Sequence, residues 1–363
     1  MKGLYIHIPF CKQICSYCDF PKMVSNIKNY DIYIDKLIQE LDSKESDLYS
    51  IDTIYIGGGT PNLLSNELLE KLFKRILKYA YFAKEVSIEC NPDLITEEQA
   101  ILFEKYKINR VSMGVETTNQ SILNSLYRKH TKEDVIKAID ILRRHNINNI
   151  NLDFIFGLPN QTITDLKNDL DFYYSLKLNH ASFYSLILED KTILAHKLEK
   201  NEIVLPNDEL TAKMYDYINF RMKDEGYKHY EISNYAKDGY ESIHNLLYWN
   251  CSEYVAVGMG ASGYIKPYRY TNYKTLTKYL LNTEESRDLI DFDEEKKEYL
   301  LLGLRKLEGV SISLYGQRFK SSILNDFNLK KYLESGLLKI SSDHLFIPED
   351  KMFISNQVFM EFV

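Results

Sequence analysis

Three cysteines share one short segment near the start of the chain, Phe10-Cys11-Lys12-Gln13-Ile14-Cys15-Ser16-Tyr17-Cys18-Asp19-Phe20. Their spacing, C-x3-C-x2-C, allows three thiolates on one loop to hold three irons of a [4Fe–4S] cluster. An electron-transfer ferredoxin fills all four iron positions with cysteine. Here the fourth iron would have no protein ligand, so it could bind and activate another molecule.

Zinc is the main alternative for these cysteines, because three thiolates and the nearby His7 would make a Cys3His set. Zinc knuckles usually combine two C-x2-C pairs, and the chain has no second pair. Cys90 and Cys251 stand alone in the sequence. Disulfides fit poorly, since three close cysteines cannot all pair. The spacing therefore favours an iron–sulfur cluster, with zinc left open.

Composition limits the class of protein. The chain has 363 residues, enough for one large domain or two. It carries 45 basic and 52 acidic residues, a net charge of −7, and no basic tract stands out, which argues against a nucleic-acid binder. Five cysteines, three of them spaced like metal ligands, fit a reducing compartment. No apolar run of about 18 residues is present, so we expect no membrane span.

The first two-thirds of the chain alternates strand-like and helix-like segments. We predict strands at Leu4–Ile8, Thr53–Ile56, Val86–Glu89, Arg110–Met113, Ile150–Phe154 and Ala181–Leu186. Amphipathic helices are predicted at Tyr30–Leu41, Glu67–Tyr79, Glu133–His145 and Leu166–Leu176. Repeated βα units indicate an α/β fold with a parallel sheet. Six units favour a partial (β/α)6 barrel, similar to part of a TIM barrel, over a doubly wound sheet.

Glycine and polar residues collect where these predicted strands end. The cysteine loop follows the first strand, and Gly57-Gly58-Gly59-Thr60-Pro61 follows the second. Glu89 ends the third, Gly114-Val115-Glu116 follows the fourth, and Asp153 lies in the fifth. Because β/α barrels place their chemistry at the carboxyl ends of the strands, we expect one site there.

The glycine run has several interpretations by itself. Consecutive glycines let a ligand approach the backbone and leave N–H and C=O groups free to bind it. A phosphate-binding P-loop requires a Gly-Lys-Ser/Thr ending, which Thr60-Pro61 does not supply. A tight strand-to-helix turn without a ligand stays open as an alternative.

The remainder of the chain changes character. After a helix, the segment from Asp208 to Tyr264 is predicted to be rich in loops. Helices at Glu294–Leu307 and Leu329–Gly336, with a hairpin formed by Leu337–Ile340 and His344–Ile347, predict a small winged-helix-like domain. We therefore expect a barrel at residues 1–205, a barrel extension at 206–285 and a C-terminal domain at 286–363.

Several segments together resemble the radical S-adenosylmethionine (SAM) superfamily and, within it, the oxygen-independent coproporphyrinogen III oxidase-like proteins. They are Tyr5-Ile6-His7-Ile8-Pro9-Phe10-Cys11, Gly57-Gly58-Gly59-Thr60-Pro61, Asn151-Leu152-Asp153 and Gly157-Leu158-Pro159, together with a similar C-terminal domain. The resemblance implies a radical SAM barrel, a [4Fe–4S] cluster on Cys11, Cys15 and Cys18, and SAM on the open iron. It implies SAM contacts at Tyr5, Gly58, Gly59, Thr60, Glu89, Glu116, Arg128 and Asp153. The family usually has Gln at the position of Glu116, so this contact is a departure.

The family that the chain resembles has two branches that differ in function. Members that oxidise coproporphyrinogen carry a further cysteine two residues after the third, and this chain has Phe20 there. The haem-chaperone branch has an aromatic residue instead and an H-N-x-x-Y-W motif, matched by His244-Asn245-Leu246-Leu247-Tyr248-Trp249. That resemblance implies haem contact at His244, Tyr248 and Trp249; a core histidine packed on the tryptophan is the alternative. Many relatives also have a histidine in the stretch matching 260–264, which this chain lacks.

From these residues we expect a cytoplasmic haem chaperone that binds haem as cargo and delivers it to haem-requiring proteins. Such a protein would use an electron donor and would not bind nucleic acid. Peripheral association with the inner face of the membrane and dimer formation are compatible with this interpretation. The alternatives are oxidative decarboxylation of coproporphyrinogen III, which Phe20 argues against, and a radical SAM oxidoreductase of tetrapyrrole metabolism with another substrate.

Overall fold

The computed structural model describes residues 1–24 and 27–363. Within these residues the strands form one twelve-stranded sheet and one separate three-stranded sheet. The order in the large sheet is β12-β11-β10-β9-β1-β2-β3-β4-β5-β6-β8-β7, so the six strands predicted from the sequence are consecutive neighbours at its centre.

The central strands are all parallel to one another. Their bounds are β1 (Lys2–Ile8), β2 (Thr53–Gly58), β3 (Glu85–Cys90), β4 (Arg110–Glu116), β5 (Asn149–Phe156) and β6 (His180–Ser185). Each strand is largely buried, because apolar side chains fill the space between the sheet and the helices. The predicted partial (β/α)6 barrel is confirmed; among the described residues, β6 and β1 do not pair, so the barrel stays open.

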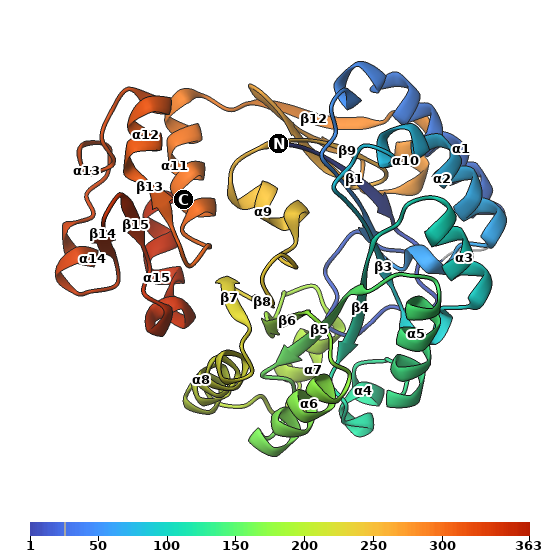
Figure 1. Ribbon diagram of the computed structural model, residues 1–363, viewed down its shortest axis with the longest axis horizontal. Coiled ribbons are helices and arrows are strands. Elements are labelled where there is room, and N and C mark those ends of the chain that lie inside the picture. The colour runs from blue at the N-terminus through green and yellow to red at the C-terminus, as the bar shows by residue number, and fades with distance from the viewer. Residues whose placement is uncertain (25–26) are drawn as a thin grey trace.

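Helices cover the outer face of these strands, as Figure 1 shows. They are α1 (Ile27–Ser43), α2 (Asn66–Ala80), α3 (Glu97–Lys105), α4 (Gln120–Ser125), α5 (Lys132–Arg144) and α6 (Ile163–Ser175). Local sequence fixes where several begin: Thr131 with Asp134, and Thr162 with Asp165, form capping boxes at α5 and α6. In α2, Leu69, Leu72, Phe73 and Ile76 recur at helical spacing on the buried face.

The segment after β6 extends the sheet at both edges. It contains α7 (Ile193–Glu199), α8 (Asp208–Asp224), β7 (Lys228–Glu231), β8 (Asn234–Ala236), α9 (Ile243–Trp249), β9 (Glu253–Val257), β10 (Ser262–Ile265), β11 (Tyr268–Asn272), α10 (Leu276–Leu281) and β12 (Glu284–Leu289). Strand β8 pairs antiparallel with β6, whereas β9 pairs parallel with β1. The prediction that this segment is rich in loops is therefore wrong. These strands are short and carry many polar residues, so no long apolar run marked them.

The C-terminal segment forms a separate lobe opposite the open side of the sheet (Figure 1). Its elements are α11 (Phe292–Gly303), β13 (Val310–Ser311), α12 (Ile312–Phe319), α13 (Ile323–Asp326), α14 (Lys330–Glu334), β14 (Lys339–Ser341), β15 (His344–Phe346) and α15 (Asn356–Phe359). Strands β14 and β15 form the predicted hairpin, and β13 adds a third strand. Short 3-10 turns lie at Glu45–Leu48, Pro61–Leu63, Pro92–Leu94, Glu349–Ile354 and Met360–Phe362.

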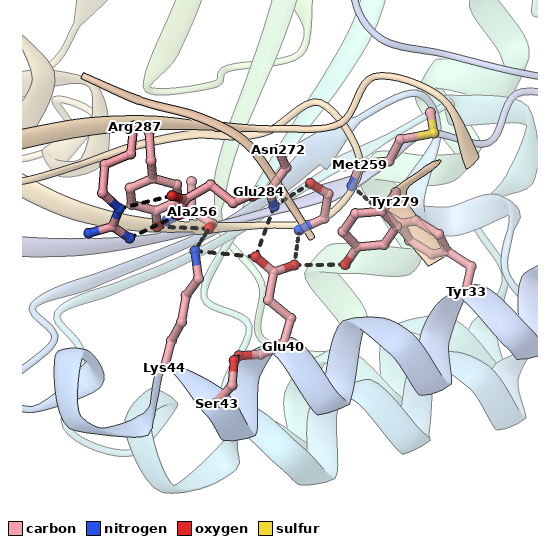
Figure 2. A network of polar contacts seen from close by, with 12 residues as sticks. Tyr33, Glu40, Ser43, Lys44, Ala256, Met259, Asn272, Tyr279, Glu284 and Arg287 are labelled. Carbon is pink, nitrogen blue, oxygen red and sulfur yellow. Dashed lines mark hydrogen bonds and ion pairs between the residues drawn. The ribbon is translucent and has the colours of Figure 1, made fainter. Parts of the chain in front are cut away.

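A buried polar network joins α1 to the sheet extension (Figure 2). The carboxylate of Glu40, whose side chain is fully buried, accepts hydrogen bonds from Gly258 N at 2.9 Å, Asn272 Nδ2 at 2.8 Å and the Tyr279 hydroxyl at 2.7 Å. The ammonium of Lys44 lies 3.3 Å from it. Each lone pair of Glu40 that the fold removes from water thus finds a donor.

None of the helices in the described parts of the chain combines the length and apolar character needed to cross a membrane.

Candidate functional site

A cavity of about 390 Å³ lies at the carboxyl ends of the central strands. Most of the residues predicted for the site line it: Cys11, Cys15, Cys18, Gly58, Gly59, Thr60, Glu89, Glu116, Arg128 and Asp153. They come from five different strands or the loops after them, separated by up to 142 residues in sequence (Cys11 to Asp153). The expected convergence at one end of the sheet is confirmed in this geometry.

The cysteine loop is closed at its base by backbone hydrogen bonds. Met23 N donates to Pro9 O at 2.8 Å, and Cys11 N donates to Met23 O at 3.0 Å. Cys11 is buried, while Cys15 and Cys18 are half-buried at the cavity wall. The sulfurs have polar neighbours, since Thr60 Oγ1 lies 3.9 Å from Cys11 Sγ and Arg128 Nη1 lies 3.9 Å from Cys15 Sγ. Such donors stabilise thiolate ligands.

A [4Fe–4S] cluster and a single metal ion need different placements of these three thiols. Within the described residues, no group of three His, Cys, Asp or Glu side chains is arranged to hold one metal ion. A [4Fe–4S] cube takes one thiolate per iron, so its ligands surround the cube rather than meet at a point. Burial raises the pKa of Cys11 to about 11, so this thiol needs the positive charge of a metal to ionise at neutral pH.

His7 is not free to complete a zinc site. Its Nε2 lies 2.7 Å from Pro21 O, which can only accept, so this nitrogen carries the proton. Its Nδ1 then accepts from the Tyr5 hydroxyl at 2.8 Å. Tyr5 is therefore placed against His7, and it is not among the described residues that line the cavity.

The glycine run packs β2 against the cysteine loop. Gly58 N donates to Glu89 Oε2, Gly59 N to Ile8 O and Thr60 N to Phe10 O, each at 2.8 Å. The expectation that these N–H groups are free for a ligand is thus wrong, because Glu89 of β3, Ile8 of β1 and Phe10 accept from all three. A Cβ at Gly59 would lie 2.7 Å from Phe10 O, so a larger residue would push the cysteine loop away.

Glu89 is the most perturbed carboxyl of the cavity. Its Oε1 accepts from the Tyr55 hydroxyl at 2.8 Å, and its Oε2 accepts from Gly58 N. Burial raises the pKa of Glu89 to about 7, and the hydrogen bonds from Gly58 and Tyr55 oppose this rise with smaller effects. A cation bound beside it would favour the ionised form.

Glu116 and Arg128 form a buried pair on the opposite wall. Arg128 Nη2 lies 3.4 Å from Glu116 Oε1, which also accepts from the Tyr17 hydroxyl at 2.9 Å. Arg128 further donates to Asn91 Oδ1 at 3.0 Å and to Gly114 O at 2.6 Å. The guanidinium thus connects the cysteine loop with the ends of β3 and β4.

Asp153 is held by neighbours inside the barrel. Its Oδ2 accepts from Ser112 Oγ at 2.9 Å and its Oδ1 from Asn151 Nδ2 at 2.8 Å. Burial raises its pKa despite these donors. Sequence reasoning missed this inner polar layer of Ser112, Asn151 and Ser182, although alternating polar residues within β4, β5 and β6 were a signal that could have found it.

The cavity is suited to a ligand that carries positive charge and a carboxylate. Three carboxyl groups, those of Glu89, Glu116 and Asp153, face it together with two guanidinium groups, those of Arg110 and Arg128. The sulfonium and ammonium groups of SAM match the former, and the carboxylate of SAM matches a guanidinium next to the cysteine loop. Cys90 and Asn245 also line the cavity, and neither was predicted.

The residues of the H-N-x-x-Y-W motif lie on α9. The side chain of His244 is fully buried, with Nδ1 2.8 Å from Thr53 Oγ1 and Nε2 2.8 Å from the Tyr248 hydroxyl. Its ring stacks on Tyr55, with ring centroids 5.1 Å apart. Both ring nitrogens are used within the fold, so in this conformation His244 cannot coordinate iron. Of the motif's residues, only Asn245 faces the cavity of the cysteines.

Phe20 stands at the mouth of that cavity with 68% of its surface exposed. Ile187, 71% exposed, and Tyr184, 40% exposed, also line it. The aromatic residue that replaces a fourth cysteine is therefore part of an apolar rim.

Comparison with known proteins identifies relatives over the whole chain. The family model of the Radical SAM superfamily matches residues 5–173, and that of the HemN C-terminal domain matches residues 290–350. The heme chaperone HemW of Lactococcus lactis is 35% identical over 367 residues, covering 99% of this chain and 96% of that protein. HemW of Bacillus subtilis is 37% identical over 376 residues, covering 100% and 99%.

Among solved structures, the radical SAM enzyme coproporphyrinogen III oxidase (HemN) of Escherichia coli superposes with a TM-score of 0.86. The match covers 99% of this chain and 89% of that one, at 20% sequence identity. This likeness concerns the fold.

Proposed function

Because the chain belongs to the radical SAM superfamily and, within it, to the family of the HemW proteins, we propose that it is a haem chaperone with a cluster and SAM site. One observation carries the cofactor part of this proposal: three thiols from one loop and three carboxyl groups from neighbouring strand ends line the same cavity. The cargo part rests on the relatives, whose name describes heme chaperones.

In this proposal Cys11, Cys15 and Cys18 hold a [4Fe–4S] cluster. When bound, such a cluster supplies an electron and one iron that is free to chelate SAM. Arg128 would bind the carboxylate of SAM, and Glu89, Glu116 and Asp153 would accept from its ammonium and ribose hydroxyl groups. Gly58, Gly59 and Thr60 form the wall beside these groups. Tyr5 would support the SAM site indirectly, because its hydroxyl orients His7, which lies beneath the glycine run.

Haem would be the cargo, and haem-requiring proteins would be the recipients. Phe20 supports this function over coproporphyrinogen oxidation, because it removes the further cysteine of the oxidising members and adds apolar surface at the mouth. Tyr248 and Trp249, which the resemblance implies as haem contacts, line a separate cavity of about 170 Å³ with Tyr254 and Tyr264. This volume is below the range of about 300–1,000 Å³ that bound organic ligands use. We further propose a cytoplasmic location, at or near the inner face of the membrane, with an electron donor as an additional partner.

The direct test is haem transfer. The protein, reconstituted with iron and sulfide, would be loaded with haemin and mixed with an apo-haemoprotein. We expect the Soret band to move to the position of the recipient's holo form. Absence of haemin binding, or of transfer, would contradict the chaperone function. Formation of protoporphyrinogen in an anaerobic assay with coproporphyrinogen III, SAM and a reductant would favour the oxidase instead.

A further inference from the structure

A second cavity, of about 700 Å³, lies between the sheet extension and the C-terminal lobe. Its walls come from α8, the β7–β8 hairpin, α9 and the segment Lys306–Glu308. In Figure 1, α8, β7 and α9 lie on the side of the sheet that faces the orange and red lobe. None of the described residues lines both this cavity and that of the cysteines. Its volume falls within the range of about 300–1,000 Å³ that bound organic ligands use.

His229 is the notable side chain of this wall. Only 4% of its side chain is exposed, and its Nδ1 lies 3.4 Å from Glu349 Oε1. An ionised carboxylate can only accept, so Nδ1 carries the proton and Nε2 keeps its lone pair. That Nε2 is buried and has no hydrogen-bond partner among the described residues. A carboxylate behind an imidazole is the arrangement that orients histidine ligands of metals.

The surroundings of His229 match a flat, apolar ring system with acidic groups. Its ring stacks on Tyr235, with centroids 4.5 Å apart and an interplanar angle of 16°. Tyr227, Tyr230, Leu246 and Leu307 provide further aromatic and aliphatic wall.

Lysines lie at the edge of the cavity. Lys228 pairs with Asp238 at 2.6 Å, and Lys306 pairs with Glu308 at 2.9 Å. The hydrogen bond from His229, and more weakly the charge of Lys223, lower the pKa of Glu349 on the same wall. The side chain of Lys223 lines the cavity and makes no hydrogen bond or ion pair within the described residues. Its ammonium is thus available for a carboxylate of a ligand.

We propose that this cavity is the haem site, with His229 Nε2 as an iron ligand and Lys223 beside a propionate. The proposal rests on the haem-chaperone function proposed above and adds where the cargo sits. It also accounts for His244, whose ring nitrogens are both engaged. Of the described residues of its motif, only Leu246 lines the new cavity, together with Ile243, which precedes the motif. Imidazole is a common axial ligand of haem iron, and tyrosine faces pack on porphyrins.

The experiment is a haemin titration of the full-length protein, followed by its Soret absorption. We compare wild type with His229→Ala and with His196→Ala, a matched control because His196 is an exposed histidine of α7. A second pair is Lys223→Glu and Lys213→Glu, both on α8, of which only Lys223 lines the cavity. Cluster absorption and far-UV circular dichroism, unchanged in every variant, show that the fold is intact.

We expect His229→Ala to change the Soret spectrum and to weaken haemin binding more than about tenfold. Lys223→Glu should weaken it about threefold to tenfold, and less at high salt. Both controls should match wild type. If wild type binds haemin and neither His229→Ala nor Lys223→Glu changes that binding, the proposed haem site is wrong, but the chaperone function is not contradicted. Absence of binding by wild type overturns both.

Discussion

Glu116 ends β4 in a left-handed backbone conformation, with φ of 61°. For a residue other than glycine, such a conformation costs about 1–3 kcal/mol and persists where surrounding contacts fix it. Those contacts are the hydroxyl of Tyr17 and the guanidinium of Arg128. Gly114 makes the arrangement possible, because a Cβ there would lie 2.7 Å from Glu116 Oε1 and 2.9 Å from Arg128 Nη2.

Gly114→Ala should therefore displace this pair and weaken SAM binding about tenfold or more, while the three cysteines still hold the cluster. The measurement is calorimetric titration of SAM into the reconstituted protein, with iron content as the readout of the cluster. Gly316→Ala, on α12, is the control: among the described residues outside that helix, a Cβ there would meet only Ser321 O, at 3.6 Å, so the variant should bind SAM as wild type does. Equal SAM affinity for Gly114→Ala would show that the Glu116–Arg128 pair does not contact SAM.

Glu89 should make the stability of the ligand-free protein depend on pH. Burial raises its pKa to about 7 from 4.5, so the folded state binds this proton more tightly than the unfolded state does. The resulting stability is complete below pH 4.5 and is lost as the pH rises through about 7. Relative to Glu89→Gln, wild type should lose about 1–3 kcal/mol of unfolding free energy between about pH 5 and pH 8.5.

Urea unfolding of wild type and Glu89→Gln at both pH values measures this difference. Because the remaining titratable groups are common to both proteins, the comparison isolates Glu89. Parallel pH profiles for the two proteins would mean that the pKa of Glu89 in the folded protein stays at its ordinary value of 4.5.

At the scale of elements, helix α9 carries the H-N-x-x-Y-W motif, and a buried carboxylate fixes where the helix begins. Its first N–H groups, at Ile243 and His244, donate to the carboxylate of Glu85 at 2.9 and 3.0 Å. Glu85 begins β3, so this buried carboxylate fixes α9 against the sheet. Residue spacing identified the motif, and Tyr248, a hydrogen-bond partner of His244, lies one helical turn after it. The other hydrogen-bond partner of His244, Thr53, is 191 residues away, which no local pattern reveals.

The network of Figure 2 fixes a second junction, between α1 and the loop after β9. Tyr33, two turns before Glu40 on the same buried face, donates to His7 O at 2.7 Å and accepts from Met259 N at 2.9 Å. The network therefore holds the backbone of His7, the residue that lies beneath the glycine run. Among the described residues of this network, Glu40 is the carboxylate whose side chain is fully buried. It accepts hydrogen bonds from Gly258, Asn272 and Tyr279.

Glu40→Gln should lower the free energy of unfolding by about 3 kcal/mol, because it removes the charge opposite Lys44 and leaves a buried donor unsatisfied. Thermal and urea unfolding provide the measurement. The control is Glu209→Gln, which breaks the exposed pair with Lys213 and should leave the free energy of unfolding close to that of wild type. A loss for Glu40→Gln no larger than that of the control would contradict this role.

At the scale of the whole molecule, the sequence was sufficient for the central barrel and for the site's main residues. Six apolar strands with polar residues at their ends have a strong periodic signal, and parallel pairing then brings Cys11, Glu89 and Asp153 together. The sheet extension was not predictable in this way, since β7 and β8 are short and β12 is mostly exposed. Supporting residues such as Tyr17 and Tyr55 were missed because only the tertiary fold reveals their partners.

The central claim is that one cavity holds a cluster with an open iron and binds SAM there. Electron paramagnetic resonance of the reduced, reconstituted protein, recorded with and without SAM, tests it most directly. We expect a [4Fe–4S] signal that changes when SAM is added, is absent in Cys15→Ala, and persists without a SAM response in Arg128→Ala. A signal that SAM leaves unchanged in wild type, or a protein that takes up zinc in place of the cluster, would contradict the account.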